Sequence, residues 1–304
     1  SYIDDISATS PKSLIQGGRY TIVDGDLAAE KISTDDAANT QLVLRYDNVV
    51  IRPQKTKVLI WYPTDSWAWV WSNSDSREHD YRRLQAWDGT RDVFQNAGAQ
   101  TTRVIGSKTN RVSFLNDGVV NGNLEQFDMI YITPGVPSGN QTVGAYTEEE
   151  AAALLNYLDK GGRIFIQAED GQFTTLNPQA TALAQRLNAG FSIGRGIQTT
   201  APATSNQASP LAAGIGNWNV VWCSEIVTTK KEVVPVFSTS GVAFCVDITA
   251  GSSADKTPWG NIAVIADGNL WNNENNINAT TFASNLIANT ASNRVTAAAG
   301  VNPN

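Results

Sequence analysis

The fold is decided by a stretch that reads TEEEAAALLNYLDKGGRIFIQ, residues 147–167. The Thr147 hydroxyl can cap a helix while Glu150 reaches back to the same end, which is the pattern of a capping box. The apolar residues that follow fall on one stripe of that helix: Ala151, Leu154, Leu155 and Leu158. Gly161 and Gly162 end the helix, and an apolar strand begins at once. A helix that runs directly into a buried strand is the repeating unit of an α/β sheet.

The same alternation continues on both sides of this stretch. Continuous apolar runs at residues 58–62, 129–132 and 262–265 predict strands that are covered on both faces. Between them we expect a helix around residues 88–97, a helix that Asn177 caps, and a last helix from Asn278 to Ile287. Alternating strands and helices imply right-handed crossovers, so the chain is predicted to form a doubly wound, mainly parallel α/β sheet.

Two parts of the chain lack the alternation. Residues 1–53 show short β-like runs broken by Gly, Asp and Asn, and we interpret them as an N-terminal β segment. Residues 199–256 lose the helical signal and predict a β-rich section inside an α/β domain that spans residues 54–290. Residues 291–304 are expected to form a small, polar tail.

Composition excludes several classes of partner. The 304 residues carry a net charge of -7, which argues against nucleic acid or an anionic membrane surface. No run approaches the ~20 apolar residues that cross a bilayer, so we expect no membrane insertion. Only 17% of the residues are charged, while Asn, Thr, Ser and Gly are frequent and nine Trp and eight Tyr occur. Such a surface is typical of exported proteins, and the sequence favours an extracellular or cell-surface location.

The carboxyl ends of the predicted strands define a candidate crevice, because ligands of parallel sheets bind at that edge. Six polar residues stand there: Asp65, Ser66, Glu169, Asp170, Asp267 and Asn269. The carboxylates could form a weak Ca²⁺ site or a glycosidase-like acid pair. The more frequent role of Asp and Asn at strand ends is to cap the following turn. Apart from that weak Ca²⁺ candidate, we predict no metal, cofactor or catalytic residue.

Known ligand-binding motifs are missing from the sequence. It contains no EF-hand loop, zinc-ligand spacing, P-loop or nucleotide-binding GxGxxG pattern. Gly194-Arg195-Gly196 is too short to count as one.

Aromatic residues gather in a Trp-rich loop, residues 61–87, whose candidate surface residues are Trp67, Trp69, Trp71 and Tyr81. They could pack on one another within a long loop, anchor a protein–protein interface or stack on sugar rings. The sequence leaves these three alternatives open, and partners of two kinds follow from them, a second copy of the chain or a glycan.

The two cysteines, Cys223 and Cys245, each lie in a short β-like run. If those strands are neighbours, a disulfide between them could stabilise the fold by ~3 kcal/mol. The alternative is a pair of buried free thiols, because free cysteine is among the most buried residue types. The even count and the export-like composition favour the disulfide slightly.

Four sequence segments, and their order along the chain, indicate a resemblance to a known family. They are the opening strand at residues 57–63, the strand and turn at 127–135, the helix-to-strand junction at 157–166 and the closing strand at 260–269. Over residues 57–290 the chain resembles the flavodoxin-like superfamily of class I glutamine amidotransferase-like domains, with a closer likeness to its ThuA-like and GIFT-type branches. The resemblance implies a flavodoxin-like sheet.

The chain departs from that superfamily where catalysis would occur. Catalytic members place a Cys at a tight strand-to-helix turn, with a His and an acid nearby. Here the turn after Ile166 reads Gln-Ala-Glu-Asp-Gly, and the single histidine, His79, lies far along the chain from either cysteine. A Cys–His pair needs hydrogen-bond reach and a site that favours the thiolate. We therefore do not expect amidotransferase or cysteine-hydrolase activity.

Two functional hypotheses follow from the sequence. The first is a non-catalytic, exported structural or binding protein that forms a homo-oligomer or filament through the N-terminal β segment and the Trp-rich loop. A β segment without a helix of its own could add to the sheet edge of another subunit. The second is a carbohydrate-binding or carbohydrate-active protein that uses the crevice carboxylates and the Trp residues.

Overall fold

The computed structural model describes residues 20–22, 26–31, 42–47, 51–53, 55–63, 89–106, 111–132, 146–171, 176–199, 201–220, 222–230, 233–250, 260–267 and 279–299. The chain divides into two compact units, Ser1–Lys55 and Thr56–Asn304. Each unit is described by itself.

The described strands of the first unit form two antiparallel pairs. β1 (Tyr20–Ile22) pairs with β4 (Ile51–Pro53), and β2 (Asp26–Lys31) pairs with β3 (Leu42–Asp47). These strands are the N-terminal β extension that the sequence predicts.

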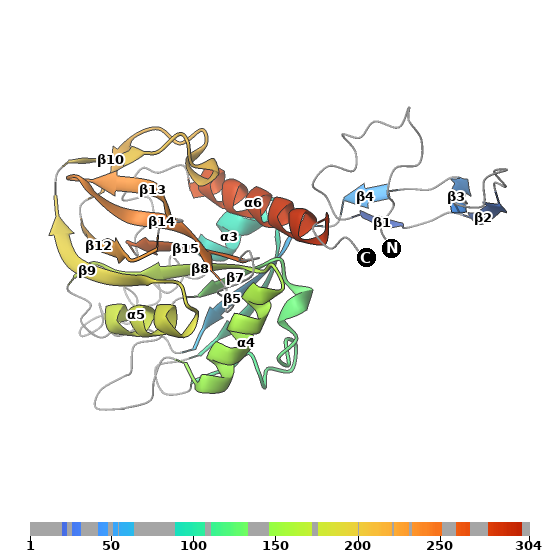
Figure 1. Cartoon of the computed structure of the whole chain (residues 1–304), viewed down its shortest axis with the longest axis horizontal. Coiled ribbons are helices and arrows are strands. Elements are labelled where there is room, and N and C mark those ends of the chain that lie inside the picture. The colour runs from blue at the N-terminus through green and yellow to red at the C-terminus, as the bar shows by residue number, and fades with distance from the viewer. Residues whose placement is uncertain are drawn as a thin grey trace. The chain divides into compact units, whose positions relative to one another are not determined.

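The second unit is built on a nine-stranded mixed sheet (Figure 1). Its parallel part contains, in spatial order, β6 (Gln100–Ile105), β5 (Lys57–Tyr62), β7 (Met129–Ile132), β8 (Arg163–Ala168) and β15 (Gly260–Ala266). Counted along the chain, this is the order 2-1-3-4-5 of flavodoxin-like folds. The doubly wound, mainly parallel sheet predicted from the sequence is therefore confirmed.

The β-rich section extends that sheet on the β15 side. Four strands continue it in antiparallel fashion: β14 (Val242–Ala250), β13 (Val233–Thr239), β10 (Pro202–Ser205) and β11 (Trp218–Asn219). The remaining strand of the section, β12 (Trp222–Thr228), forms a separate antiparallel pair with β9 (Phe191–Gln198), which directly precedes the section. Most of the β-rich section thus belongs to the main sheet, a point that the sequence left open.

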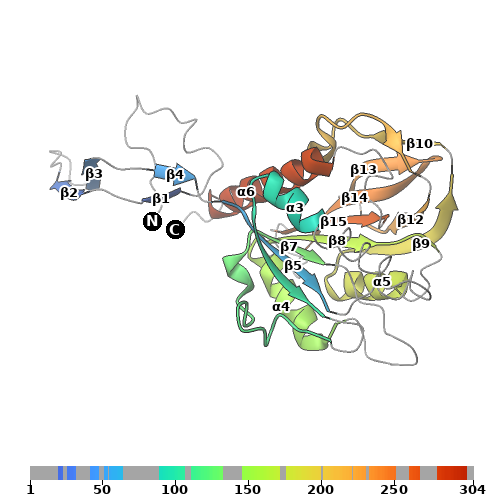
Figure 2. The ribbon, with the colours of Figure 1, turned by 180° about the vertical axis from the view of Figure 1, so that it is seen from behind.

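Helices cover both faces of the sheet (Figures 1 and 2). α4 (Glu148–Asp159) and α5 (Leu176–Arg186) pack on one face, and α3 (Gly89–Asn96) and α6 (Ala279–Ala299) lie on the other. Two short 3-10 helices occur as well, η4 (Leu124–Gln126) and η5 (Pro210–Ala212). None of the described helices combines the length and the apolar character that crossing a membrane requires.

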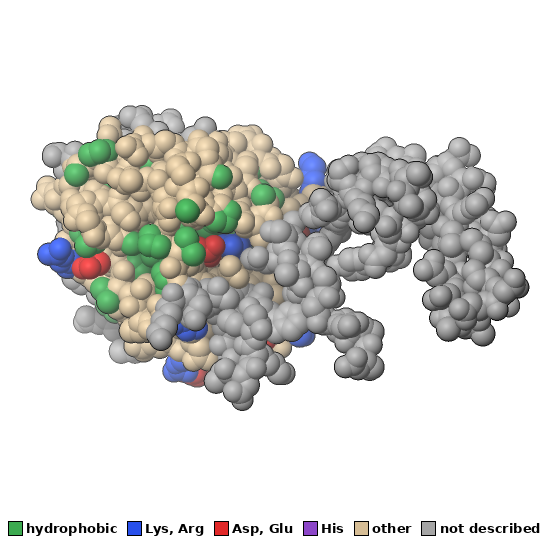
Figure 3. Space-filling view, turned by 45° about the horizontal axis from the view of Figure 1, so that its top comes forward, with side chains coloured by type: hydrophobic (Ala, Val, Ile, Leu, Met, Phe, Trp, Pro, Cys, Tyr) green, Lys and Arg blue, Asp and Glu red, His purple; other side chains and the backbone are tan. Residues whose placement is uncertain are grey.

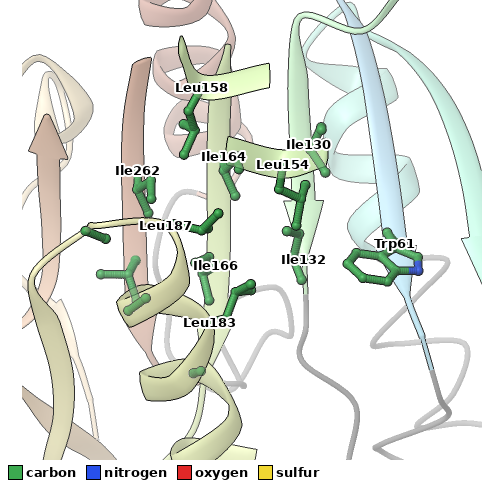
Figure 4. Close-up of a cluster of buried hydrophobic side chains, with 14 of the residues drawn as sticks. Trp61, Ile130, Ile132, Leu154, Leu158, Ile164, Ile166, Leu183, Leu187 and Ile262 are labelled. Atoms are coloured by element: carbon green, nitrogen blue, oxygen red, sulfur yellow. The ribbon is translucent and has the colours of Figure 1, made fainter. Parts of the chain in front are cut away.

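Each face has its own hydrophobic core. On the α4 and α5 face, Leu154 and Leu158 pack with Ile130 of β7 and Ile164 of β8, and all four are buried (Figure 4). On the other face, Phe165 of β8 meets Phe282 of α6 edge to face, with ring centroids 5.9 Å apart. Because successive side chains of β8 point to opposite faces, one strand supplies both cores.

The start of α4 has the geometry that the sequence predicts. The Glu150 backbone N–H donates to Thr147 Oγ1 at 3.2 Å, and the Thr147 N–H donates to Glu150 Oε2 at 2.7 Å. The helix ends before Gly161, whose φ of 82° lies in the left-handed region that glycine adopts readily. A Cβ atom at Gly162 would lie 2.2 Å from the Tyr157 ring, so a larger residue just before β8 would force that buried ring to move.

Two local predictions are corrected by the structure. Asn177 lies inside the first turn of α5 and bonds to the turn after β8, so it is not the cap of its own helix. α6 continues to Ala299, whereas a polar tail was expected from residue 291. The predicted cap Asn278 lies outside the described residues.

Candidate functional site

The candidate crevice lies where β8 and β15 end. These neighbouring parallel strands are in register, with Ala168 opposite Ala266, so Glu169 and Asp267 leave the sheet side by side. Glu169 is 5% exposed, Asp170 is 8% exposed and Asp267 is 1% exposed. The structure thus brings three of the six predicted crevice residues to one edge of the sheet, and it buries all three.

The turn after β8 is held by the side chain of Asn177. Its Oδ1 accepts from the Glu169 N–H at 3.0 Å, and its Nδ2 donates to the carbonyl oxygens of Glu169 and Asp170, both at 2.9 Å. The Asp170 N–H in turn donates to Glu169 Oε2 at 2.9 Å. The turn after β8 is therefore fixed by hydrogen bonds to the side chains of Asn177 and Glu169.

The same turn touches β9 through two glycines. A Cβ atom built on Gly171 would lie 2.6 Å from the Cα of Gly196, and one built on Gly196 would lie 2.8 Å from the Cα of Gly171. Real Cβ atoms do not approach other atoms so closely, so the contact requires glycine on both sides. This contact joins the turn after β8 to the β9–β12 pair.

Cys223 of β12 is the thiol near the crevice. Burial, together with the smaller effects of the charges of Asp267 and Asp170, raises its pKa to about 12. Because both carboxylates act on the sulfur, Cys223 lies within electrostatic range of two of the crevice acids, Asp170 and Asp267. A thiol with such a pKa stays protonated near neutral pH and is a poor nucleophile.

The predicted disulfide is corrected by the structure. Cys223 and Cys245 are both free and buried in the hydrophobic core. Their strands are not hydrogen-bonded to each other, since β12 pairs with β9 whereas β14 lies between β13 and β15. Burial also raises the pKa of Cys245 well above its ordinary value, with a further contribution from Asp247. The alternative of two buried free thiols describes this structure.

The crevice shows no arrangement for a cation in the described part of the chain. No group of three or more His, Cys, Asp or Glu side chains is placed there to hold a metal ion. Glu169, Asp170 and Asp267 each have interaction partners within the protein. Asp65, Ser66 and Asn269, the other predicted crevice residues, lie outside the described residues.

The aromatic candidates of the Trp-rich loop are not described either. Trp67, Trp69, Trp71 and Tyr81 fall in residues 64–88, of which the structure says nothing. Their roles as interface or sugar-stacking residues stay predictions.

A groove that the sequence did not indicate lies beside the crevice. It has a volume of about 570 Å³ and runs between α5 and β9. Asn177, Thr181 and Gln185, at successive turns of one helix face, line it on one side, and residues 194–196 line it on the other. The only sequence signal for it is Gly194-Arg195-Gly196, which matches no nucleotide-binding motif.

Comparison with known proteins gives structural neighbours alone. No protein-family model matches the chain, and no curated protein matches it. Solved structures that resemble it include the N-terminal domain of mmIFT52, with 12% identity, a TM-score of 0.45 and coverage of 70% of this chain and 87% of that one. Another is the cytoplasmic protein STM1381 from Salmonella typhimurium LT2, with 11% identity, a TM-score of 0.49 and coverage of 76% and 98%.

A third neighbour is a beta-galactosidase from Rahnella sp. R3, with 9% identity, a TM-score of 0.40 and coverage of 81% of this chain but 31% of that one. At such low identities, the activities and partners of these neighbours cannot be assigned to this chain. The strand order of the parallel sheet by itself is that of flavodoxin-like folds, as the sequence resemblance implies.

Proposed function

We propose that the chain is a non-catalytic, exported structural or binding protein, a member of the ThuA-like and GIFT-type branch that has lost the catalytic cysteine. The observation that carries the proposal is the turn after β8. Where catalytic relatives carry the nucleophile, this chain has Glu169 and Asp170, tied to Asn177 by three hydrogen bonds. A turn fixed in this way suits a rigid scaffold.

The state of the thiols supports the same proposal. Cys223 is the cysteine within electrostatic range of the crevice, and its surroundings raise its pKa to about 12. An activated cysteine needs the opposite, a neighbouring cation or helix N-terminus that lowers the pKa. In this protein the neighbouring charges are carboxylates, which oppose formation of the thiolate.

An activity assay tests the non-catalytic part. Release of ammonia from glutamine, or hydrolysis of activated esters, is expected to stay at the background rate for the full chain. Activity that is lost in Cys223→Ala and kept in Cys245→Ala would overturn the proposal, since both substitutions remove a buried thiol and only one of them lies by the crevice acids.

Self-association is the second part of the proposal. The described strands of the N-terminal unit form pairs of two strands each. An isolated two-stranded pair is marginally stable in water, so these strands would gain stability by adding to the sheet of another copy. The Trp-rich loop, with Trp and Tyr as typical interface residues, would supply a second contact.

Sedimentation velocity tests the assembly. The full chain is expected to form species larger than 32.7 kDa that grow with concentration. Deletion of residues 1–50 leaves the second unit with its own two cores and should reduce the sample to monomer. Val119→Ser serves as a control at an exposed site and should leave the assembly unchanged. A full chain that sediments as a monomer at all concentrations would contradict the proposal.

The carbohydrate alternative has no observation in its favour among the described residues. Exposures of 5%, 8% and 1% for Glu169, Asp170 and Asp267 count against an acid pair that a sugar could reach. A glycan array remains its test, with binding expected to fall on Trp69→Ala or Asp170→Ala if the alternative holds.

A further inference from the structure

We propose that the groove between α5 and β9 binds a small molecule that carries a carboxylate. This inference goes beyond the scaffold function and stands without it, because it depends on neither the N-terminal unit nor self-association. The groove has a volume of about 570 Å³, which is within the range of ligand pockets, roughly 300–1,000 Å³.

The sign of the ligand follows from the charges along the groove. Among the described residues that line it, Arg195 is the only charged one. Its Nε lies 3.5 Å from Glu225 Oε2, and the Arg195 side chain is 75% exposed. Its two terminal nitrogens make no hydrogen bond within the described part of the protein, so they can donate in parallel to one carboxylate. Glu225 approaches the guanidinium at Nε, so the edge formed by the two terminal nitrogens stays accessible.

The opposite side of the groove offers neutral hydrogen-bonding groups. The Gln185 amide is exposed and has no hydrogen-bond partner among the described residues. Thr181 Oγ1 accepts from the Ile193 N–H at 3.0 Å, which leaves its hydroxyl proton to donate. An anion that also carries a second polar group, such as a short dicarboxylate, matches this pairing of one cation with an amide and a hydroxyl.

The edge of β9 that lines the groove is poorly suited to pairing with an added peptide strand. The Thr181–Ile193 hydrogen bond already uses one backbone donor on this edge of β9, and Gly171 contacts Gly196 directly. An extended peptide needs consecutive free backbone groups along a sheet edge. A compact small molecule needs only the Arg195 fork and the α5 side chains.

The face of the molecule that Figure 3 shows carries no broad apolar patch among the described residues. There the hydrophobic side chains form small, separate groups, and Lys, Arg, Asp and Glu are sparse.

Titration of the ¹⁵N-labelled full chain with succinate and with glutarate tests the proposal. Saturable shifts are expected at the amide signals of Gly171, Gly194 and Gly196, and the signal of Gly118 should stay fixed. Neutral succinamide, and sodium chloride at equal ionic strength, should give no such shifts. Because a hydrogen bond to a charged group is lost, Arg195→Gln should weaken binding by about tenfold or more.

Two further variants separate the groove from general charge effects. Ala182→Phe fills the groove from α5 and should abolish the shifts while the Gly118 signal reports an intact fold. Arg186→Gln removes an ion-paired arginine on the same helix that does not line the groove, and it should leave the affinity unchanged. The proposal is overturned if neither dicarboxylate gives saturable shifts, if succinamide or chloride reproduces them, or if Arg195→Gln binds with unchanged affinity.

Discussion

Asn177 joins both backbone groups of Glu169, accepting from its N–H at 3.0 Å and donating to its carbonyl oxygen at 2.9 Å. One side chain from the first turn of α5 thereby fixes the turn at the carboxyl end of β8. Since all of these groups are buried, water cannot replace the amide if it is lost.

Asn177→Ala should accordingly destabilise the protein. It leaves the Glu169 N–H and the Glu169 and Asp170 carbonyl groups without this partner, at a cost of about 1–3 kcal/mol for a buried unsatisfied group. Urea unfolding measures the loss. Asn156→Ala, at an exposed position of α4, is the control and should change the free energy of unfolding by under about 0.5 kcal/mol. Equal effects of the two substitutions would show that the turn does not depend on the amide.

Gly171→Ala and Gly196→Ala should each disturb the contact between the turn and β9. The new methyl group would lie 2.6 Å or 2.8 Å from the backbone of the other glycine, so one segment must move. Overpacking of this kind costs about 1–3 kcal/mol, which thermal unfolding can resolve. Gly118→Ala, where a Cβ atom meets nothing within 4 Å, should leave the melting temperature nearly unchanged.

Glu150→Ala should be the most damaging single change at the start of α4. The Glu150 side chain completes the capping box with Thr147 and also forms a two-pronged ion pair with Arg111, while itself 0% exposed. Removing it takes away the carboxylate that pairs with Arg111, and breaking a buried pair costs about 3–5 kcal/mol. Glu149→Ala, at the neighbouring exposed position, is the matched comparison in a chemical unfolding experiment. A similar loss from both variants would assign the effect to helix charge instead of the buried pair.

Stability should fall in alkaline solution because of Cys223. Its folded pKa, about 12, is above the ordinary value of 9.0, so the folded state keeps the thiol proton at pH values where the unfolded state loses it. The contribution is full below pH 9 and declines as the pH rises from 9 towards 12. Urea unfolding at pH 7 to 10.5 measures this decline, which Cys223→Ala should reduce.

Thiol labelling with Ellman's reagent at pH 8 gives an independent check. Both cysteines are buried and should react only in step with unfolding. Rapid reaction of the native protein with one equivalent of reagent would contradict the buried, protonated state of the thiols.

The sequence by itself determined the parts of this protein that depend on local pattern. Three such features are the capping box at Thr147, the apolar stripe of α4 and the buried run of β8. Each spans only one or two helical turns or a single strand, so its pattern can be recognised along the chain. Their alternation was enough to predict the parallel sheet, and the turn after Ile166 was enough to show that no cysteine stands there.

Only the tertiary structure decided what joins distant parts of the chain. Residues 199–256 have strand patterns that are equally compatible with the main sheet and with a separate one, and long-range pairing placed β14 beside β15 and β12 beside β9. The local sequence pattern predicted that Asn177 caps its own helix. The prediction failed because the backbone groups that Asn177 bonds belong to the turn after β8, which only the folded chain brings within reach. The approach of Gly171 to Gly196, and the groove with Arg195 beside it, arise from packing between α5, β8 and β9. No periodicity in the sequence records such packing, because it depends on which surfaces meet after the sheet has formed.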